Sequence, residues 1–130
     1  MKFYLLVDEP LSGKTTILKE LGYTFVSDTW LGRFSSLRKA IYEGKKKIAI
    51  DDYISEGNVG VTVELMWENK KLIYEQMYKE PVYIPPEKYK DVEIVLSTTP
   101  IHLNKIGLGL QARCQKVTVE EFKKIKEEEI

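Results

Sequence analysis

Short apolar runs alternate with amphipathic stretches along this chain. Runs rich in Val, Ile, Leu and Tyr are typical of buried strands. Apolar residues at every third or fourth position instead indicate helices with one buried face. Strands are predicted at residues 2–7, 23–27, 47–52, 92–97 and 117–119. Helices are predicted at residues 14–21, about 28–44, 63–78 and from 118 onward.

Several of these elements carry typical boundary residues. Thr118 and Glu121 have the spacing of a capping box, in which each side chain accepts a hydrogen bond from the backbone of the other. A charged terminal helix is therefore expected to begin there. The remaining boundary residues are Gly22 and Gly44 after helices, Asp28 or Thr29 before a helix, and Pro81, Pro85 and Pro86 in an extended connection.

The order of these elements predicts the fold class. Strands that alternate with helices form parallel sheets that are covered on both faces. We therefore expect an α/β fold with three layers and a mainly parallel five-stranded sheet. The chain has 130 residues, which suits one domain with one core, residues 1–130. In such sheets ligands bind outside the carboxyl ends of the strands.

Candidate chemistry begins directly after the first strand. Residues 12–16 read Ser-Gly-Lys-Thr-Thr and follow an apolar strand. This is the arrangement of a phosphate-binding loop, whose backbone N–H groups and following helix N-terminus hold phosphate oxygens. Lys14 would neutralise phosphate charge, and the hydroxyl of Thr15 would hold Mg²⁺. The predicted nucleotide-binding residues are Pro10, Leu11, Ser12, Gly13, Lys14, Thr15 and Thr16.

Asp8 departs from the usual loop pattern, which has glycine at its first position. Glycine serves there because the chain leaves the strand in an unusual backbone geometry, which aspartate also tolerates. A carboxylate about 4 Å from a phosphate would cost roughly 1 kcal/mol in water and about 4 kcal/mol at an effective dielectric near 20. The loop is therefore weakened unless this side chain points away.

Polar residues also follow two later strands. Asp51 and Asp52 close the third strand, where an acid can hold the Mg²⁺ shell and a second acid can polarise an attacking water. The fourth strand ends in Ser97-Thr98-Thr99, and a hydroxyl there can touch a γ-phosphate or position water. The alternatives are a solvated strand end for the acids and a local Ser/Thr turn for the hydroxyls.

Arg113 is one of three arginines in the chain and lies shortly before the last strand. A planar guanidinium suits a triphosphate better than an ammonium does. It could reach into the site of a neighbouring subunit. From spacing alone, a surface arginine in an ion pair is the better interpretation.

A family resemblance strengthens the functional interpretation. The segments Pro85-Pro86-Glu87, Val92–Pro100 and Leu110–Cys114 resemble the sensor-1 and Ser-Arg-Cys region of clamp-loader ATPases of the AAA+ class of P-loop NTPases. The resemblance covers roughly residues 2–120, in islands. It implies that Thr99 is the sensor hydroxyl, that Arg113 acts in trans in a homo-oligomer, and that Asp51 and Asp52 form the magnesium element.

The chain departs from that family at four points. Asp8 replaces a glycine, Asp52 a glutamate and Ala112 a serine, and there is no room for the helical lid domain. The first hypothesis is a Mg²⁺-dependent ATPase in a nucleic-acid-related or assembly process, with Lys14, Asp52, Thr99 and Arg113 as catalytic residues. The second is a nucleotide-binding or structural protein that has lost turnover. A small-molecule kinase is less well supported.

Composition limits the partners and the compartment. Net charge is zero, so a nucleic-acid partner is possible but is not indicated, and no apolar run reaches membrane length. A single cysteine fits a reducing cytosol and excludes an internal disulfide, and we expect a cytoplasmic protein. One histidine and one cysteine are too few for a structural zinc site of those ligand types. The tyrosines are expected mostly in packing positions.

Overall fold

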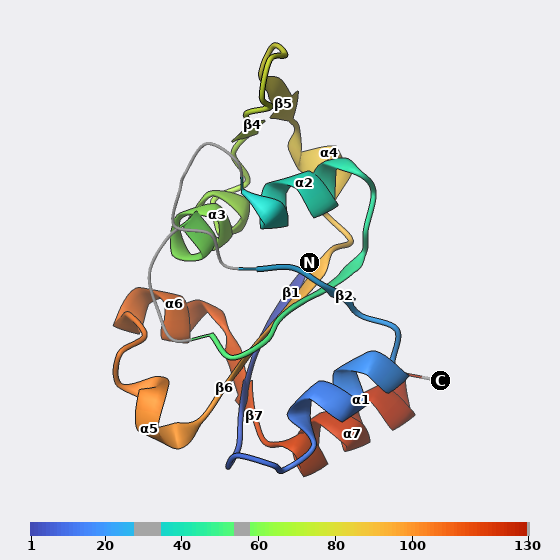
Figure 1. Cartoon of the computed structure of the whole chain (residues 1–130), viewed down its shortest axis with the longest axis vertical. Coiled ribbons are helices and arrows are strands. Elements are labelled where there is room, and N and C mark those ends of the chain that lie inside the picture. The colour runs from blue at the N-terminus through green and yellow to red at the C-terminus, as the bar shows by residue number, and fades with distance from the viewer. Residues whose placement is uncertain (28–34, 54–57, 130) are drawn as a thin grey trace.

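The structure is a computed structural model that describes residues 1–27, 35–53 and 58–129 (Figure 1). A five-stranded sheet forms its centre, in the order β2-β3-β6-β1-β7, and every pair of neighbours in it is parallel. The fold is therefore mixed α/β with a parallel sheet flanked by helices, as the alternation of patterns predicted. The strands are β1 (Lys2–Val7), β2 (Thr24–Phe25), β3 (Lys47–Ile50), β6 (Glu93–Thr98) and β7 (Gln115–Val117).

Helices cover both faces of this sheet, because successive residues of the strands point to opposite sides. Tyr4 and Leu6 pack with α1 (Lys14–Glu20) and α7 (Val119–Glu128), whereas Phe3 and Leu5 belong to the core on the other face. The helices on that second face are α2 (Ser36–Tyr42), α3 (Asn58–Trp67) and α6 (Leu108–Arg113), and two single-turn helices, α4 (Pro86–Tyr89) and α5 (Pro100–Leu103), flank β6 in the chain.

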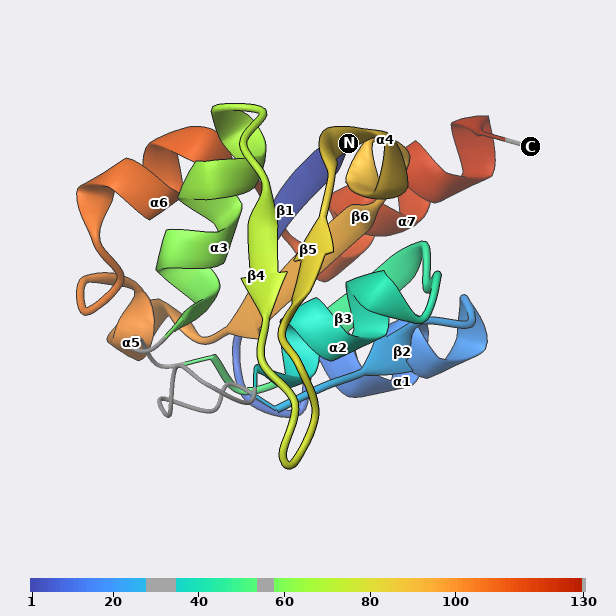
Figure 2. The same cartoon turned by 90° about the horizontal axis from the view of Figure 1, so that it is seen from above.

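The prediction of a long helix at residues 63–78 is wrong. The helix α3 begins at Asn58 and ends at Trp67. Just beyond its end, Asn69 adopts a left-handed conformation with φ 60°, and the N–H of Lys70 bonds to the carbonyl of Leu65. An antiparallel hairpin follows, made of β4 (Leu72–Tyr74) and β5 (Val82–Ile84). It lies over α2 and α3 on the outer side of their layer (Figures 1 and 2).

Some of the predicted element boundaries agree with the structure, and others differ from it. The capping box at Thr118 and Glu121 is confirmed, with both of its hydrogen bonds present. The last strand spans residues 115–117 rather than 117–119, because α7 already begins at Val119. Asp28 and Thr29, expected as helix caps, lie outside the described residues, and within the described chain Ser35 caps α2 by accepting from the N–H of Arg38. Among the described residues, none of the helices has the length and apolar character needed to cross a membrane.

Candidate functional site

The site lies at the carboxyl ends of β1, β6 and β3, which are neighbours in the sheet. Because the strands are parallel, the segments that follow them leave from the same edge. Backbone hydrogen bonds join these segments: the N–H of Asp8 donates to the carbonyl of Thr98, and the N–H of Tyr53 donates to the carbonyl of Ser97. Three polar segments that are distant in sequence therefore meet at one edge of the sheet.

The loop after β1 turns into α1 through left-handed residues. Gly13, the residue before α1, has φ 96°, and Leu11 has φ 64°. A side chain at Gly13 would find space, but that backbone conformation is strained for any residue with a Cβ. Asp8 is not among the residues with positive φ, so the geometry that would explain a glycine at the first loop position occurs instead at Leu11 and Gly13.

Lys14 is held inside this loop. Its side chain is 7% exposed, and its ammonium donates to the carbonyl oxygens of Asp8 and Glu9, both at 2.8 Å. A buried ammonium needs such partners because an unpaired buried charge is costly. The lysine thus closes the loop on itself, and a ligand anion would compete with two carbonyl groups for it.

The carboxylate of Asp8 accepts two backbone hydrogen bonds. One oxygen accepts from the N–H of Val119 at 3.0 Å, at the first residue of α7, and the other accepts from the N–H of Glu9 at 2.9 Å. These two backbone hydrogen bonds lower the pKa of Asp8, and Lys14 makes a smaller contribution. The carboxylate therefore binds the first residue of α7 and is favoured there in its ionised form.

Asp51 connects two other elements of the site through side-chain hydrogen bonds. Its Oδ2 accepts from the hydroxyl of Thr15 at 2.6 Å, and its Oδ1 accepts from the hydroxyl of Ser97 at 3.0 Å. The three residues come from α1, from the turn after β3 and from β6. Thr15 and Asp51, the two residues predicted to hold a metal, are thus in direct contact although 36 positions separate them.

A cavity of about 470 Å³ opens beside this contact. Asp52 and Thr99 line it together with the loop and the first turn of α1. Ser12, Asp51 and Arg113 do not line the cavity. Its full lining is Pro10, Leu11, Gly13, Lys14, Thr15, Thr16, Asp52 and Thr99, and each of these residues was predicted as a site residue.

Asp52 and Thr99 face this cavity in different ways. Asp52 is exposed and has φ 50°, a conformation that aspartate tolerates better than most residues. Thr99 is half-buried, and its hydroxyl pairs with Nδ1 of His102 at 3.1 Å. The family resemblance pointed to Thr99 but not to His102, whose contact depends on the turn that begins α5.

Arg113 lies apart from the cavity. It ends α6, two positions before the start of β7, and the first residue of β7 pairs with Tyr4 in the middle of β1 rather than with its carboxyl end. Its guanidinium donates to the carbonyl of Gly109 at 3.0 Å, and its Nε is buried without a hydrogen-bond partner among the described residues. The chain thus does not bring Arg113 to its own loop, and the contact with a neighbouring subunit stays a prediction.

The donors present fit magnesium bound together with a nucleotide. Mg²⁺ prefers hard oxygen ligands and is usually held by one or two carboxylates together with phosphates and water. Thr15 and Asp51 supply a hydroxyl and a carboxylate next to a loop whose lysine can neutralise an anion. Among the described residues no group of three or more His, Cys, Asp or Glu side chains is placed to hold a metal ion.

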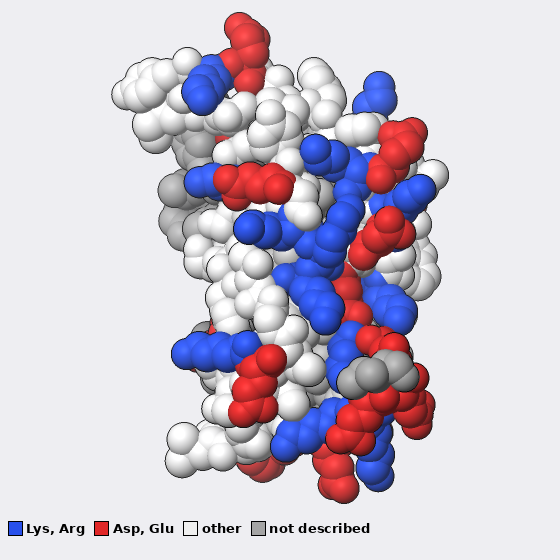
Figure 3. Space-filling view, turned by 90° about the vertical axis from the view of Figure 1, so that its right-hand side faces the viewer, with Lys and Arg blue, Asp and Glu red and all other residues white. Residues whose placement is uncertain are grey.

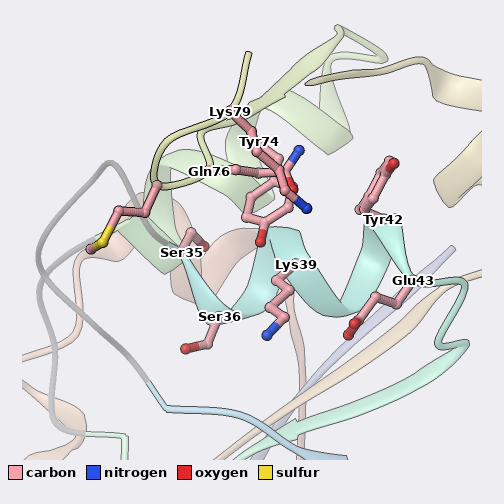
Figure 4. Close-up of a pocket in the computed structure, with 9 residues that line it drawn as sticks. Ser35, Ser36, Lys39, Tyr42, Glu43, Tyr74, Gln76 and Lys79 are labelled. Carbon is pink, nitrogen blue, oxygen red and sulfur yellow. The ribbon is translucent and has the colours of Figure 1, made fainter. Parts of the chain in front are cut away.

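Hollows elsewhere on the described part of the molecule include two with several basic lining residues. A cavity of about 590 Å³ runs between α2 and the segment after β4, and Lys39, Tyr42, Tyr74 and Lys79 are among its lining residues (Figure 4). It is larger than the cavity at the loop, but the loop cavity adjoins the contact between Thr15 and Asp51. We therefore take the smaller cavity as the candidate site.

The second hollow, of about 300 Å³, lies at the amino ends of β1, β3 and β6, where Lys2, Lys46, Lys47 and Lys90 line it together with Asp91 and Glu93. The lateral face of the molecule shows a band of basic side chains with acidic ones along both sides (Figure 3). Mixed charge of this kind reduces the long-range field of a basic surface.

Ser97 is the functional candidate that sequence reasoning missed. The run Ser97-Thr98-Thr99 indicated a hydroxyl at this position, but the pattern did not show which of the three would face the acids. The side chains of β6 alternate between the two faces of the sheet, and this alternation is the signal that identifies Ser97. Val95 packs with α1 and α7, and Ser97 follows it by two positions on the same face. Asp51 likewise follows Ala49 on that face.

Comparison with known proteins gives no family assignment: no family model matches this chain, and no curated protein matches it significantly. The interpretation of the site therefore depends on its own geometry and chemistry.

Proposed function

We propose that this protein is a P-loop nucleoside-triphosphate-binding protein and a Mg²⁺-dependent ATPase, related to the nucleotide-binding core of AAA+ clamp-loader ATPases. Its task would lie in a nucleic-acid-related or assembly process. The support comes from the loop after β1, the acid after β3 and the hydroxyl residues that end β6, all at one edge of a parallel sheet.

A single observation carries this proposal, the hydrogen bond of 2.6 Å between the hydroxyl of Thr15 and the carboxylate of Asp51. The two residues belong to separate motifs, each interpreted as a magnesium element from its own local pattern. An unrelated strand-to-helix turn would give no reason for these two side chains to meet. Their contact makes a shared ligand the simplest explanation of both motifs.

Each residue has a defined task in this proposal. Backbone N–H groups of the loop bind phosphate oxygens, and Lys14 exchanges the carbonyls of Asp8 and Glu9 for the terminal phosphates. Thr15 and Asp51 would hold Mg²⁺, which neutralises charge on the phosphate oxygens when bound. Asp52 and Thr99 line the cavity and would orient the attacking water.

Calorimetric titration with Mg²⁺-ATP tests the binding proposal. We expect saturable binding by the wild type and an affinity at least about 30-fold weaker for Lys14→Ala, since losing a charge-assisted hydrogen bond costs about 2 kcal/mol. Lys19→Ala is the matched control, because Lys19 lies exposed on the same helix and should leave affinity unchanged. A wild type that does not bind at millimolar nucleotide would contradict the proposal.

A second candidate function is nucleotide binding without turnover. It is favoured by the place of Arg113 outside the cavity and by the short, exposed side chain of Asp52. Release of inorganic phosphate distinguishes the two candidates. Turnover that falls in Asp52→Asn, at unchanged nucleotide affinity, supports the ATPase, whereas binding without any phosphate release supports the second candidate.

A further inference from the structure

Ser97 and Thr15 hold the carboxylate of Asp51 from two sides. Ser97 is fully buried on β6 and donates to Oδ1 at 3.0 Å, while Thr15 on α1 donates to Oδ2 at 2.6 Å. Each carboxylate oxygen therefore has its own donor from a different element. A carboxylate offers about four acceptor sites, so both oxygens can still accept from further groups.

The backbone of Ser97 holds the same turn. Its carbonyl accepts from the N–H of Tyr53 at 2.7 Å, two positions beyond the acid that its hydroxyl holds. Between these anchors Asp52 takes its left-handed conformation. Ser97 thus fixes both the side chain that leaves β3 at Asp51 and the course of the chain after it.

We propose that Ser97 is a positioning residue, which fixes the carboxylate of Asp51 in the orientation needed for a nucleotide-bound magnesium ion. This inference rests on the proposed function. Without Ser97, Thr15 would be the one side chain of the described residues that holds the carboxylate. Metal binding would then have to fix the rotamer of Asp51, and the lost side-chain entropy would weaken it. Outer groups that orient a metal ligand typically contribute 10- to 100-fold in metal affinity.

Thr98, the next residue on β6, offers a matched control. Its hydroxyl is buried and makes no hydrogen bond within the described part of the chain, and its side chain points to the opposite face of the strand. Thr98→Val therefore removes an unused hydroxyl at nearly constant volume, and Ser97→Ala removes the one that holds Asp51. If the hydroxyls of this strand had only a structural role, the two variants would show the same magnesium dependence of ATP binding.

The test is calorimetry of ATP binding at magnesium concentrations from zero, with chelator, to several millimolar. For Ser97→Ala we expect the magnesium concentration that gives half of the affinity gain to rise about tenfold. ATP affinity with chelator should stay within about twofold of wild type. Thr98→Val should follow the wild-type curve. Ser97→Thr, which restores a hydroxyl, should recover most of the shift, with thermal unfolding as a check on folding.

A second measurement needs no ligand. Side-chain couplings measured by NMR should show one χ1 rotamer for Asp51 in the wild type and rotamer averaging in Ser97→Ala. A single rotamer in Ser97→Ala would overturn the inference.

The calorimetric outcomes separate the two proposals. Magnesium-dependent binding by the wild type with an unshifted curve for Ser97→Ala, or with an equal shift for Thr98→Val, would overturn the role of Ser97 alone. A wild type that gains no ATP affinity from magnesium would overturn the proposed metal site, and the role of Ser97 with it.

Discussion

Asp8 shows how a single side chain can change what a motif predicts. It stands at the first position of the loop, where its charge would oppose a phosphate, yet its carboxylate binds the N–H of Val119 at the start of α7. Backbone N–H groups at a helix start lack partners in their own helix and favour negative charge. The residue that weakens the loop pattern therefore connects the loop to the C-terminal helix.

We predict that Asp8→Ala lowers the free energy of unfolding by about 1 kcal/mol at pH 7, as for the loss of a helix cap. The pKa of Asp8 is lowered in the folded state from its ordinary 3.8, so its stabilisation is present above that pH and is lost as pH falls through the folded value. Urea unfolding at pH 7 and pH 3 should show the difference from wild type shrinking at the lower pH.

Asp91→Ala is the control, because Asp91 is exposed and makes no hydrogen bond or ion pair with the described residues. A difference between Asp8→Ala and wild type that is equal at both pH values would show that the carboxylate charge is not its cause.

At the scale of elements, the hairpin of β4 and β5 is the main departure from the expected fold. Leu72 is fully buried in the core that contains α2 and α3, while its neighbour Ile73 is 42% exposed. Arg38 on α2 donates to the carbonyl of Ile73 at 2.8 Å and to the hydroxyl of Thr62 on α3 at 3.0 Å. The hairpin is thus part of the packing that covers one face of the sheet.

Substitutions at these two neighbours should have unequal effects. Leu72→Ala should destabilise the protein by about 2–5 kcal/mol, because it leaves a cavity in the core. Ile73→Ala should cost less than about 1 kcal/mol, since its side chain is partly solvated already. Thermal or urea unfolding measures both, and equal losses would contradict the alternation described for β4.

At the scale of the whole molecule, the open question is the role of Arg113. The residue ends α6 and does not line the cavity beside the loop of its own chain, so under the proposed function it would act in the site of another copy. A trans arginine makes turnover depend on assembly. It also predicts that two defective chains can complement each other when each supplies the part that the other lacks.

We expect turnover per subunit to rise with protein concentration, and Arg113→Ala to lower it by about 10³-fold with little change in ATP affinity. Mixing Lys14→Ala with Arg113→Ala chains should restore part of the phosphate release, because a mixed pair contains one intact site. Lys116→Ala, an exposed residue on β7, is the control for surface charge. Turnover independent of concentration, without complementation in an oligomer that exchanges subunits, would contradict the trans role.

Much of the fold could be predicted from the sequence, because local patterns set its elements. The apolar run at residues 2–7, the spacing of Thr118 and Glu121 and the alternation of strands with helices each indicated what the structure contains. The segment 72–84 was harder, because a short apolar run is compatible with either a strand or a buried helix. Its partner strand and the core beneath it decided the outcome.

The sequence by itself determined which residue types follow each strand, and so which side chains could meet at the carboxyl edge of a parallel sheet. Tertiary structure decided which of them do. Parallel pairing of β6 between β1 and β3 brings Ser97 and Thr15 to opposite oxygens of Asp51. Pairing of β7 with the other side of β1 places the start of α7 beside Asp8. Such contacts join residues up to 111 positions apart, and their direction depends on strand order and alternation, which no local pattern contains.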